Sequence, residues 1–199
     1  MTKEKYISEL RLKIESYHAI SEASWLKIAA LIQFQDLEKN ALLLRNGQIA
    51  KNIHFVCKGA LRAYITDAAG NSYNKNIFLE NDFAGSTVSY LLQKPSNFSL
   101  EALENTTLIH LDYKKYRQLI DTHLDLKNFY IAYLEKNWIL EKEQREVSLV
   151  MENATERYRD LLLKHPNIDQ RIQQLHIASH LGITPTQLSR IRKDLKKSP

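Results

Sequence analysis

Residues 175–197, near the end of the chain, carry the pattern that most restricts the fold. Three apolar residues recur at helical spacing and would share one face of a first helix: Leu175, Ala178 and Leu181. Gly182 then provides a residue that tolerates the positive φ with which many helices end. Thr184 can cap a second helix, and Pro185 suits its first position, where no N–H is needed. The spacing therefore predicts a helix-turn-helix.

The second helix of this motif is predicted to have an apolar and a polar face. Leu188, Ile191 and Leu195 form the apolar face. Short polar side chains and an arginine at the start of such a helix are the groups that read base edges in a major groove. The residues predicted to contact DNA are Thr184, Thr186, Gln187, Ser189, Arg190, Arg192, Lys193, Lys196 and Lys197. The alternative is an ordinary helical hairpin with a solvated basic face.

The excess positive charge lies in the last quarter of the chain. The 199 residues include 28 Lys and Arg against 23 Asp and Glu, a formal net charge of +5. From residue 154 onward nine basic residues stand against four acidic ones, which leaves nineteen of each in residues 1–153. A polyanion such as double-stranded DNA should therefore bind the last segment and not the protein at large.

Other kinds of site find little support. Cys57 is the only cysteine, so no disulfide within the chain and no cysteine-ligated cluster can form, and we expect a small packed side chain. His176 and His180 have ligand-like spacing but no third ligand nearby, so we expect a solvated or phosphate-facing pair and no metal. No catalytic arrangement stands out, and we expect no enzyme. Without a membrane-length apolar stretch or a signal-peptide pattern, we expect a cytoplasmic protein with no membrane contact.

The middle of the chain changes to a period of two. It follows two helical segments within residues 3–33, the second capped near Ser21. Strands are predicted at residues 41–45, 53–58, 60–66, 72–79, 98–103 and 107–111. Their spacing of about 8–12 residues, with turn residues such as Gly70 between them, is typical of an antiparallel β sandwich or barrel.

A long helix is predicted at residues 125–151, after a short one at 113–120. Eight residues in it alternate at spacings of four and three, as in a coiled-coil seam: Leu126, Tyr130, Tyr133, Asn137, Leu140, Gln144, Val147 and Met151. A second stripe could pack on the β domain: Phe129, Ile131, Leu134 and Trp138. We interpret the first stripe as a homodimer interface, because one small β domain can hardly cover both. The alternative is a helix buried within one subunit.

A helix break near Asn153, with Thr155 as the expected cap of the next helix, coincides with the change in charge balance. We therefore divide the chain into three parts. Residues 1–124 form a β sensor domain with N-terminal helices, residues 125–152 form the dimerisation helix, and residues 153–199 form a helical DNA-binding domain.

The order of these parts resembles the cyclic-AMP receptor/Fnr (Crp/Fnr) family of bacterial transcription regulators over nearly the full length. The stretches that carry the resemblance are 55–64, 81–85, 108–113 and 177–190, the last being the most specific. The resemblance implies an α+β fold. An antiparallel β-roll (a double-stranded β-helix or jelly roll of the cyclic-nucleotide-binding type) with flanking helices would precede the dimerisation helix and an all-α helix-turn-helix domain. It also implies a homodimer that binds a two-fold DNA operator and touches RNA polymerase.

Carried over position by position, the family's base-reading residues fall on Pro185, Thr186 and Arg190. Arg190 can donate two hydrogen bonds to a guanine edge, whereas Pro185 cannot read a base in this way and Thr186 replaces a common glutamate. The half-site should therefore differ from the family's best-known one. Most of the wing seen in many relatives is missing after this helix, so Lys193, Lys196 and Lys197 are expected to grip the DNA backbone.

The family's ligand cassette is altered. Gly85 is kept, but Ser86 stands for the glutamate that binds the ribose hydroxyl and Ser96 for the arginine that binds the phosphate. Losing the charge-assisted contact of that arginine costs roughly 1.5–3 kcal/mol, unless Lys94 swings in. The residues predicted to line a ligand site are Gly85, Ser86, Thr87, Lys94, Ser96 and Asn97. On residue types alone, the turn before Ser86 fits an anion site and a plain loop equally well.

These patterns together predict a regulator with no identifiable cofactor, whose effector, if it has one, is a small molecule other than cyclic AMP or cyclic GMP. The alternative is a small-molecule-binding regulatory module whose basic tail contacts a protein. An enzyme built on the β domain has no candidate nucleophile or acid–base pair.

Overall fold

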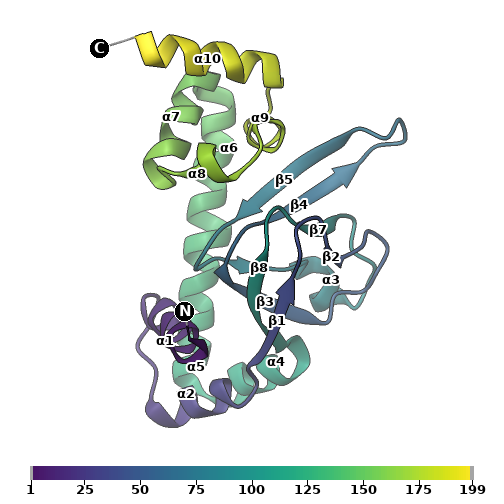
Figure 1. The fold of residues 1–199 in the computed structure, drawn as a ribbon. Helices are drawn as coiled ribbons and strands as arrows, with labels where there is room; N and C mark the ends of the chain where they lie inside the picture. The colour runs from purple at the N-terminus through teal and green to yellow at the C-terminus, as the bar shows by residue number, and fades with distance from the viewer. Residues whose placement is uncertain (1, 198–199) are drawn as a thin grey trace.

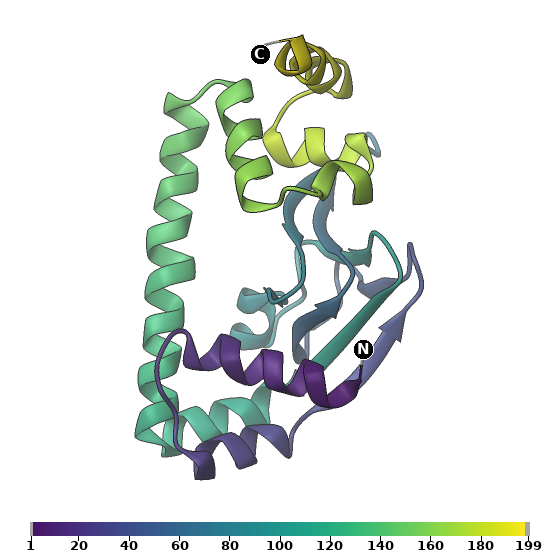
Figure 2. The ribbon, with the colours of Figure 1, turned by 60° about the vertical axis from the view of Figure 1, so that its left-hand side comes forward.

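The computed structural model describes residues 2–197, which form a β-roll, a long helical rod and a group of shorter helices (Figure 1). The rod runs along one side of the roll, with the C-terminal helices at one end and the N-terminal helices at the other (Figure 2). None of the helices within residues 2–197 combines the length and the apolar character needed to cross a bilayer.

Two antiparallel sheets of four strands each form the roll, in the orders β1-β8-β3-β6 and β2-β7-β4-β5. The strands are β1 (Gln33–Leu37), β2 (Leu42–Leu44), β3 (Asn52–Lys58), β4 (Leu61–Thr66), β5 (Ser72–Phe78), β6 (Phe83–Ala84), β7 (Ser99–Ala102) and β8 (Thr106–Asp112). The prediction of an antiparallel β domain is thus confirmed. Two strands were missed as separate elements: β1, which begins the domain, and β6, which has only two residues and too little length for a periodic signal.

Helices cover both ends of the roll. They are α1 (Lys3–Glu15), α2 (Glu22–Ala29), α3 (Thr87–Leu92) and α4 (Tyr113–Thr122). Ser21 caps α2 as expected, because the Ser24 N–H donates to its hydroxyl at 3.2 Å. The main core joins the roll to α1, α2 and α4, and Leu10, Ile28, Ile109 and Ile120 are among its fully enclosed members. Leu12 is 64% exposed, since it lies two residues out of phase with the buried Leu10 and Ile14.

The rod consists of α5 (Leu124–Leu134), a π-helical turn (Glu135–Leu140) and α6 (Glu141–Met151). In a π-helix the hydrogen bonds span five residues, so the turn rotates the residues after it relative to those before it. The predicted eight-residue seam crosses this turn and is therefore not one continuous face. Leu126 lies fully buried in the subunit core, and Asn137 bonds to the Tyr17 hydroxyl and the Tyr133 carbonyl of its own chain.

The first four seam residues are therefore held by packing within the subunit: Leu126, Tyr130, Tyr133 and Asn137. The other four lie exposed on one face, from the last residue of the turn onward: Leu140, Gln144, Val147 and Met151. In the second stripe Phe129 is buried, whereas Ile131 is 47% and Trp138 is 39% exposed. The prediction of one eight-residue dimer seam is therefore corrected. Only its second four residues form an exposed stripe that a partner subunit could cover.

The C-terminal helices (residues 154–197) are α7 (Ala154–Lys164), α8 (Ile168–Arg171), α9 (Gln174–Leu181) and α10 (Pro185–Lys197). The cap of α7 is Asn153 and not Thr155, which was a wrong prediction. The Asn153 carboxamide oxygen accepts from the N–H groups of Thr155 and Glu156, and the Glu156 carboxylate accepts from the Asn153 N–H. Asn153, the first of the two polar residues at the break, therefore caps the helix, and Thr155 lies within its first turn.

The C-terminal helices share a core with the roll. Ala60, Leu79 and Leu103 of the roll pack in one cluster with a set from these helices: Tyr158, Ile168, Ile172, Ile177, Ala178, Leu181 and Leu188. The β4–β5 hairpin extends from the roll to α9 (Figure 1), where the Asn74 side chain donates to the His176 carbonyl at 2.9 Å. The Asn74 N–H donates to the Ser179 hydroxyl at 2.7 Å. The two parts are therefore docked in one arrangement.

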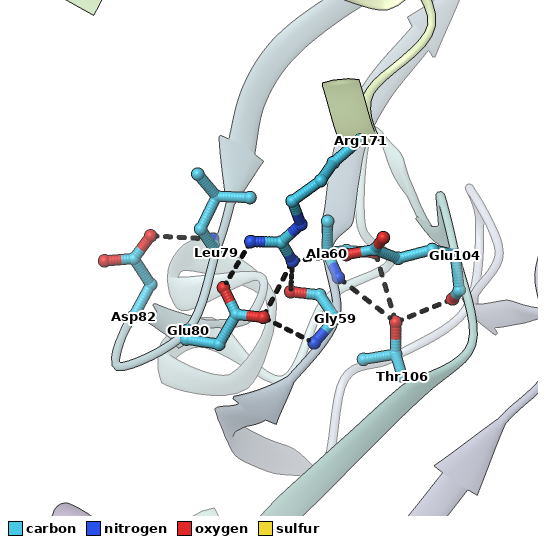
Figure 3. A network of polar contacts seen from close by, with 8 residues as sticks. All are labelled: Gly59, Ala60, Leu79, Glu80, Asp82, Glu104, Thr106 and Arg171. Atoms are coloured by element: carbon cyan, nitrogen blue, oxygen red, sulfur yellow. Dashed lines mark hydrogen bonds and ion pairs between the residues drawn. The ribbon is translucent and has the colours of Figure 1, made fainter. Parts of the chain in front are cut away.

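A polar network closes this contact around Arg171 at the end of α8 (Figure 3). Its guanidinium donates to both carboxylate oxygens of Glu80, at 2.9 and 2.7 Å, and pairs with Glu104. The same group donates to the Gly59 carbonyl at 3.4 Å, while the Gly59 N–H donates to Glu80 at 2.9 Å. The Glu80 hydrogen bond is the largest influence that raises the pKa of Arg171. Partial burial works against ionisation of Glu80, but the hydrogen bonds from Arg171 and Gly59 outweigh it and lower the pKa of Glu80.

Candidate functional site

The helix-turn-helix prediction matches the geometry of α9 and α10. Gly182 ends α9 at a φ of +72°, and the Ile183 N–H donates to the Ala178 carbonyl at 3.0 Å. The Gln187 N–H donates to the Thr184 hydroxyl at 3.2 Å, and the Thr184 N–H donates to the Gln187 carboxamide oxygen at 2.9 Å. This reciprocal pair is a capping box, which fixes the direction in which α10 leaves the turn.

The two helices bury the faces that hold them together, with one exception. Ala178, Leu181 and Leu188 are buried, and Ile191 and Leu195 pack against the same cluster. Leu175 is 57% exposed and was wrongly assigned to the buried face; Ile177 is fully buried in its place. The reason is that α9 rests on β5 as well as on α10, so its buried arc includes the residue next to Ala178.

The opposite face of α10 is open. Thr184, Thr186, Gln187, Ser189, Arg190, Lys193 and Lys196 are all exposed. Arg192 is half-buried, with one guanidinium nitrogen 3.4 Å from the Asp169 carboxylate of α8. The Lys197 side chain lies outside the described part of the structure. The polar residues predicted to contact DNA thus lie together on one exposed surface, apart from Arg192, whose charge is partly neutralised.

His176 and His180 do not form the solvated pair that was expected. Each imidazole is half-buried, and the His176 Nδ1 lies 3.4 Å from an Arg62 nitrogen. Burial, followed by the charge of Arg145, lowers the pKa of His180 to about 4. Among residues 2–197 no three His, Cys, Asp or Glu side chains lie close enough together to hold a metal ion. Cys57 is the packed side chain that was expected, and burial raises the pKa of its thiol to about 12.

The altered ligand cassette is closed by its own side chains. Ser86 and Ser96 are both 2% exposed, and the Ser96 hydroxyl lies 2.9 Å from the Ser86 hydroxyl. The Ser96 oxygen also lies 2.9 Å from the Phe98 carbonyl. The two serines that replace the expected ligand-binding pair are therefore satisfied by hydrogen bonds within the chain.

A cavity nevertheless lies next to this cassette, between the roll and the rod. Gly85 and Thr87 line it, whereas Ser86, Lys94, Ser96 and Asn97 do not contribute to its lining. Lys94 and Asn97 are exposed on the outer side of the loop. Of the six residues predicted for a ligand site, the structure brings two to the cavity.

Sequence reasoning missed Lys75, which lines the same cavity. On β5, Asn74 pairs with Tyr64 and Asn76 pairs with Ala63, so Lys75 is the additional residue of a β-bulge. A bulge leaves the inserted residue unpaired and redirects its side chain. A lysine between two asparagines carries no strand-face signal of its own, and the bulge depends on a partner strand that the local sequence does not identify.

Comparison with known proteins agrees with this architecture. Residues 34–123 match the family model described as the cyclic nucleotide-binding domain. Sequence comparison with curated proteins finds no match.

Solved structures of Crp/Fnr-type regulators have the same fold. FixK2 from Bradyrhizobium japonicum is 18% identical, with a TM-score of 0.68 over 83% of this chain and 84% of that one. The c-di-GMP responsive global regulator CLP from Xanthomonas campestris is 15% identical, with a TM-score of 0.66 over 88% of this chain and 92% of that one. A CooA variant from Carboxydothermus hydrogenoformans is 17% identical, with a TM-score of 0.63 over 94% and 84%. At this identity the likeness establishes the fold.

Proposed function

We propose that this protein is a dimeric, sequence-specific DNA-binding transcription regulator of the Crp/Fnr type. The observation that carries the proposal is the exposed polar and basic face of α10, held behind a turn by Gly182 and the Thr184 cap. The positive charge of residues 154–199 and the near-neutral remainder support DNA as the partner. The structurally similar CLP, a global regulator that links cell–cell signalling to virulence gene expression, is consistent with this role.

The exposed residues of α10 would divide the work of recognition. Arg190 has the fork of donors that matches a guanine edge, and Thr186, Gln187 and Ser189 can contact neighbouring bases. Lys193, Lys196 and Lys197 would hold the phosphate backbone. Arg192 would position α8 through Asp169, with its outer side toward the phosphates.

A second subunit would supply the second recognition helix. The exposed stripe Leu140, Gln144, Val147 and Met151 on the rod supports a two-fold contact there. Two-fold symmetry would place one α10 on each half of a palindromic operator. Contact of the bound dimer with RNA polymerase is part of the same proposal.

The roll would act as a sensor that does not bind cyclic AMP in the usual way. The Ser86–Ser96 hydrogen bond supports this view, because no fixed cation replaces the family's arginine at that position. Gly85 and Thr87 would remain as ligand contacts, and Ser86, Lys94, Ser96 and Asn97 would shape the loop that covers the site.

The experiment is selection of binding sites from a randomised duplex pool, followed by anisotropy titrations of the selected duplex and a scrambled one. Arg190→Ala should weaken binding to the selected duplex by about tenfold to hundredfold and leave the scrambled duplex almost unchanged, because it removes a base contact. Lys196→Ala should weaken both duplexes equally and reduce the salt dependence, because it removes a phosphate contact. Both variants lie on the exposed surface of α10 and should fold.

Equal losses on both duplexes for Arg190→Ala would exclude base reading by that residue. If no duplex binds with a salt-dependent affinity, the basic tail contacts a protein, and the chain is a small-molecule-binding regulatory module.

A further inference from the structure

Two hollow regions between the roll and the rod share part of their lining, and together they are called the cavity here. Both are lined by Ile53, Phe83, Thr87, Tyr90, Tyr133 and Trp138. Neither region is fully enclosed. The cavity therefore extends beyond the roll interior and reaches between α4 and α5.

The first region is aromatic. Besides the shared wall it is bounded by Tyr113, Tyr116, Phe129 and Tyr130. Tyr90 and Tyr113 stack on each other with ring centroids 4.2 Å apart. The Tyr116 side chain is only 6% exposed, so the inner end of this region is enclosed.

The second region carries the charge. The bulge at Lys75 brings its side chain to the cavity rim beside Gly85, and its ammonium lies 5.2 Å from the centre of the Phe98 ring. Within the described residues no carboxylate lies within ion-pair distance of Lys75. Partial burial, followed by the charges of Arg145 and Lys142 on α6, lowers the pKa of Lys75. Lys142 and Arg145 of the rod are thus close enough to Lys75 to disfavour its charged form.

A ligand of this cavity needs an apolar, flat body and one anionic group. Aromatic walls favour planar rings, and an ammonium at the rim without a carboxylate partner favours an anion. Ser86 and Ser96 of the neighbouring cassette bond to each other and do not line the cavity.

We propose that the cavity binds an aromatic acid, with the carboxylate at Lys75 and the ring between Trp138 and the tyrosines. The aromatic acid would be the effector of the proposed regulator. Its role as an effector rests on the proposed function, whereas its binding to the cavity does not. Lys75 is the residue that distinguishes an acid from a neutral molecule of the same shape.

The test is calorimetry on the purified full-length protein with three probes: naphthalene-2-acetate, the neutral 2-(2-naphthyl)ethanol, and cyclic AMP. The acid should bind about tenfold more tightly than the alcohol, as a charge-assisted hydrogen bond predicts. In Lys75→Gln the acid should weaken to the level of the alcohol, while the alcohol is unchanged. Lys58→Gln, the matched control on an exposed strand lysine outside the cavity, should retain the full preference. Cyclic AMP should bind more weakly than the acid.

Equal affinity for acid and alcohol, an unchanged preference in Lys75→Gln, or no saturable binding of the acid up to about 1 mM would each overturn the proposal. Tight binding of cyclic AMP that depends on Lys75 would assign the cavity to nucleotides instead. Duplex binding by the same samples separates the two proposals, because the acid can fail while DNA binding persists, and the reverse.

Discussion

Gly59 lies between β3 and β4 at a φ of +97°, and the backbone of Thr106 passes close to its Cα. A Cβ at this position would lie 2.5 Å from the Thr106 hydroxyl oxygen and 2.7 Å from the Thr106 Cα. Gly70, in the β4–β5 hairpin, has a similar φ of +86° but open space around it. Comparing substitutions at Gly59 and Gly70 therefore separates the free-energy cost of a positive φ from the cost of the close contact with Thr106.

Gly59→Ala should lower the free energy of unfolding by about 3 kcal/mol or more, because strain at positive φ adds to a backbone clash. Gly70→Ala should cost about 1 kcal/mol, the conformational part alone. Urea unfolding at one protein concentration measures both. Similar losses in the two variants would show that the contact with Thr106 relaxes without cost.

His54 is a buried base opposite His110 in the β3–β8 pairing. Burial, followed by the charge of His110, lowers the pKa of His54 to about 3. In the unfolded chain the pKa of a histidine is near its usual value of about 6.5. Below about pH 6.5 the unfolded state therefore binds a proton at His54, whereas the folded state does not. The contribution of His54 is therefore fully present above about pH 6.5 and is lost as the pH falls toward 3.

The free energy of unfolding should fall between pH 7.5 and pH 5 in the unaltered protein. In His54→Phe this fall should be smaller by about 2 kcal/mol, because the phenyl ring does not titrate. The measurement is urea unfolding of both proteins at the two pH values. An identical pH dependence in the variant and in the unaltered protein would contradict the assignment.

At the scale of elements, α8 and α9 are fastened to the roll by charge as well as by apolar contact. Arg171 bridges Glu80 and Glu104, and each of the three side chains is about one-third exposed or less. Arg117 and Asp121 form a more exposed ion pair within α4. Arg171 thus forms ion pairs between different elements, and Arg117 provides a comparison in which the ion pair lies within one helix.

Arg171→Ala should destabilise the protein by about 1–3 kcal/mol and speed amide hydrogen exchange in α8 and α9, because two carboxylates lose their partner. Arg117→Ala should cost less than about 1 kcal/mol, as exposed pairs do. Hydrogen exchange followed by mass spectrometry resolves the location of the change. Uniform protection across α8 and α9 in Arg171→Ala would mean that the apolar cluster alone holds the helices.

The sequence predicts those elements whose signals are local. Gly70, Gly182, Ser21 and Thr184 act as expected, because turns and caps depend on neighbours within a few residues. The bulge at Lys75 and the network of Arg171 were missed, since each depends on a partner far along the chain. The candidate cavity was predicted only in part for the same reason: Gly85 follows a family pattern, whereas the aromatic wall is assembled from separate helices.

At the scale of the whole molecule, a hydrophobic stripe remains uncovered on α6. Val147 is 53% and Met151 is 78% exposed, while the residues that precede the π-helical turn pack inside the subunit. A second copy of the chain would bury this stripe by two-fold symmetry.

Val147→Glu should convert the proposed dimer to a monomer at micromolar concentration, because a carboxylate would be buried opposite its own symmetry mate. Leu163→Glu, on the exposed face of α7, should remain dimeric, although this leucine is 79% exposed. Sedimentation equilibrium measures both masses. A monomeric unaltered protein, or a dimer that survives Val147→Glu, would place the contact elsewhere.

The π-helical turn at Glu135–Leu140 also fixes a direction. Each residue advances an α-helix by about 100°, so a rod with one residue fewer at this point would aim its far end toward a different side of the roll. The C-terminal helices follow that end of the rod (Figure 2). A single added residue in the rod thus sets the angle at which α10 is held, and its removal would turn the exposed face of α10 relative to the roll.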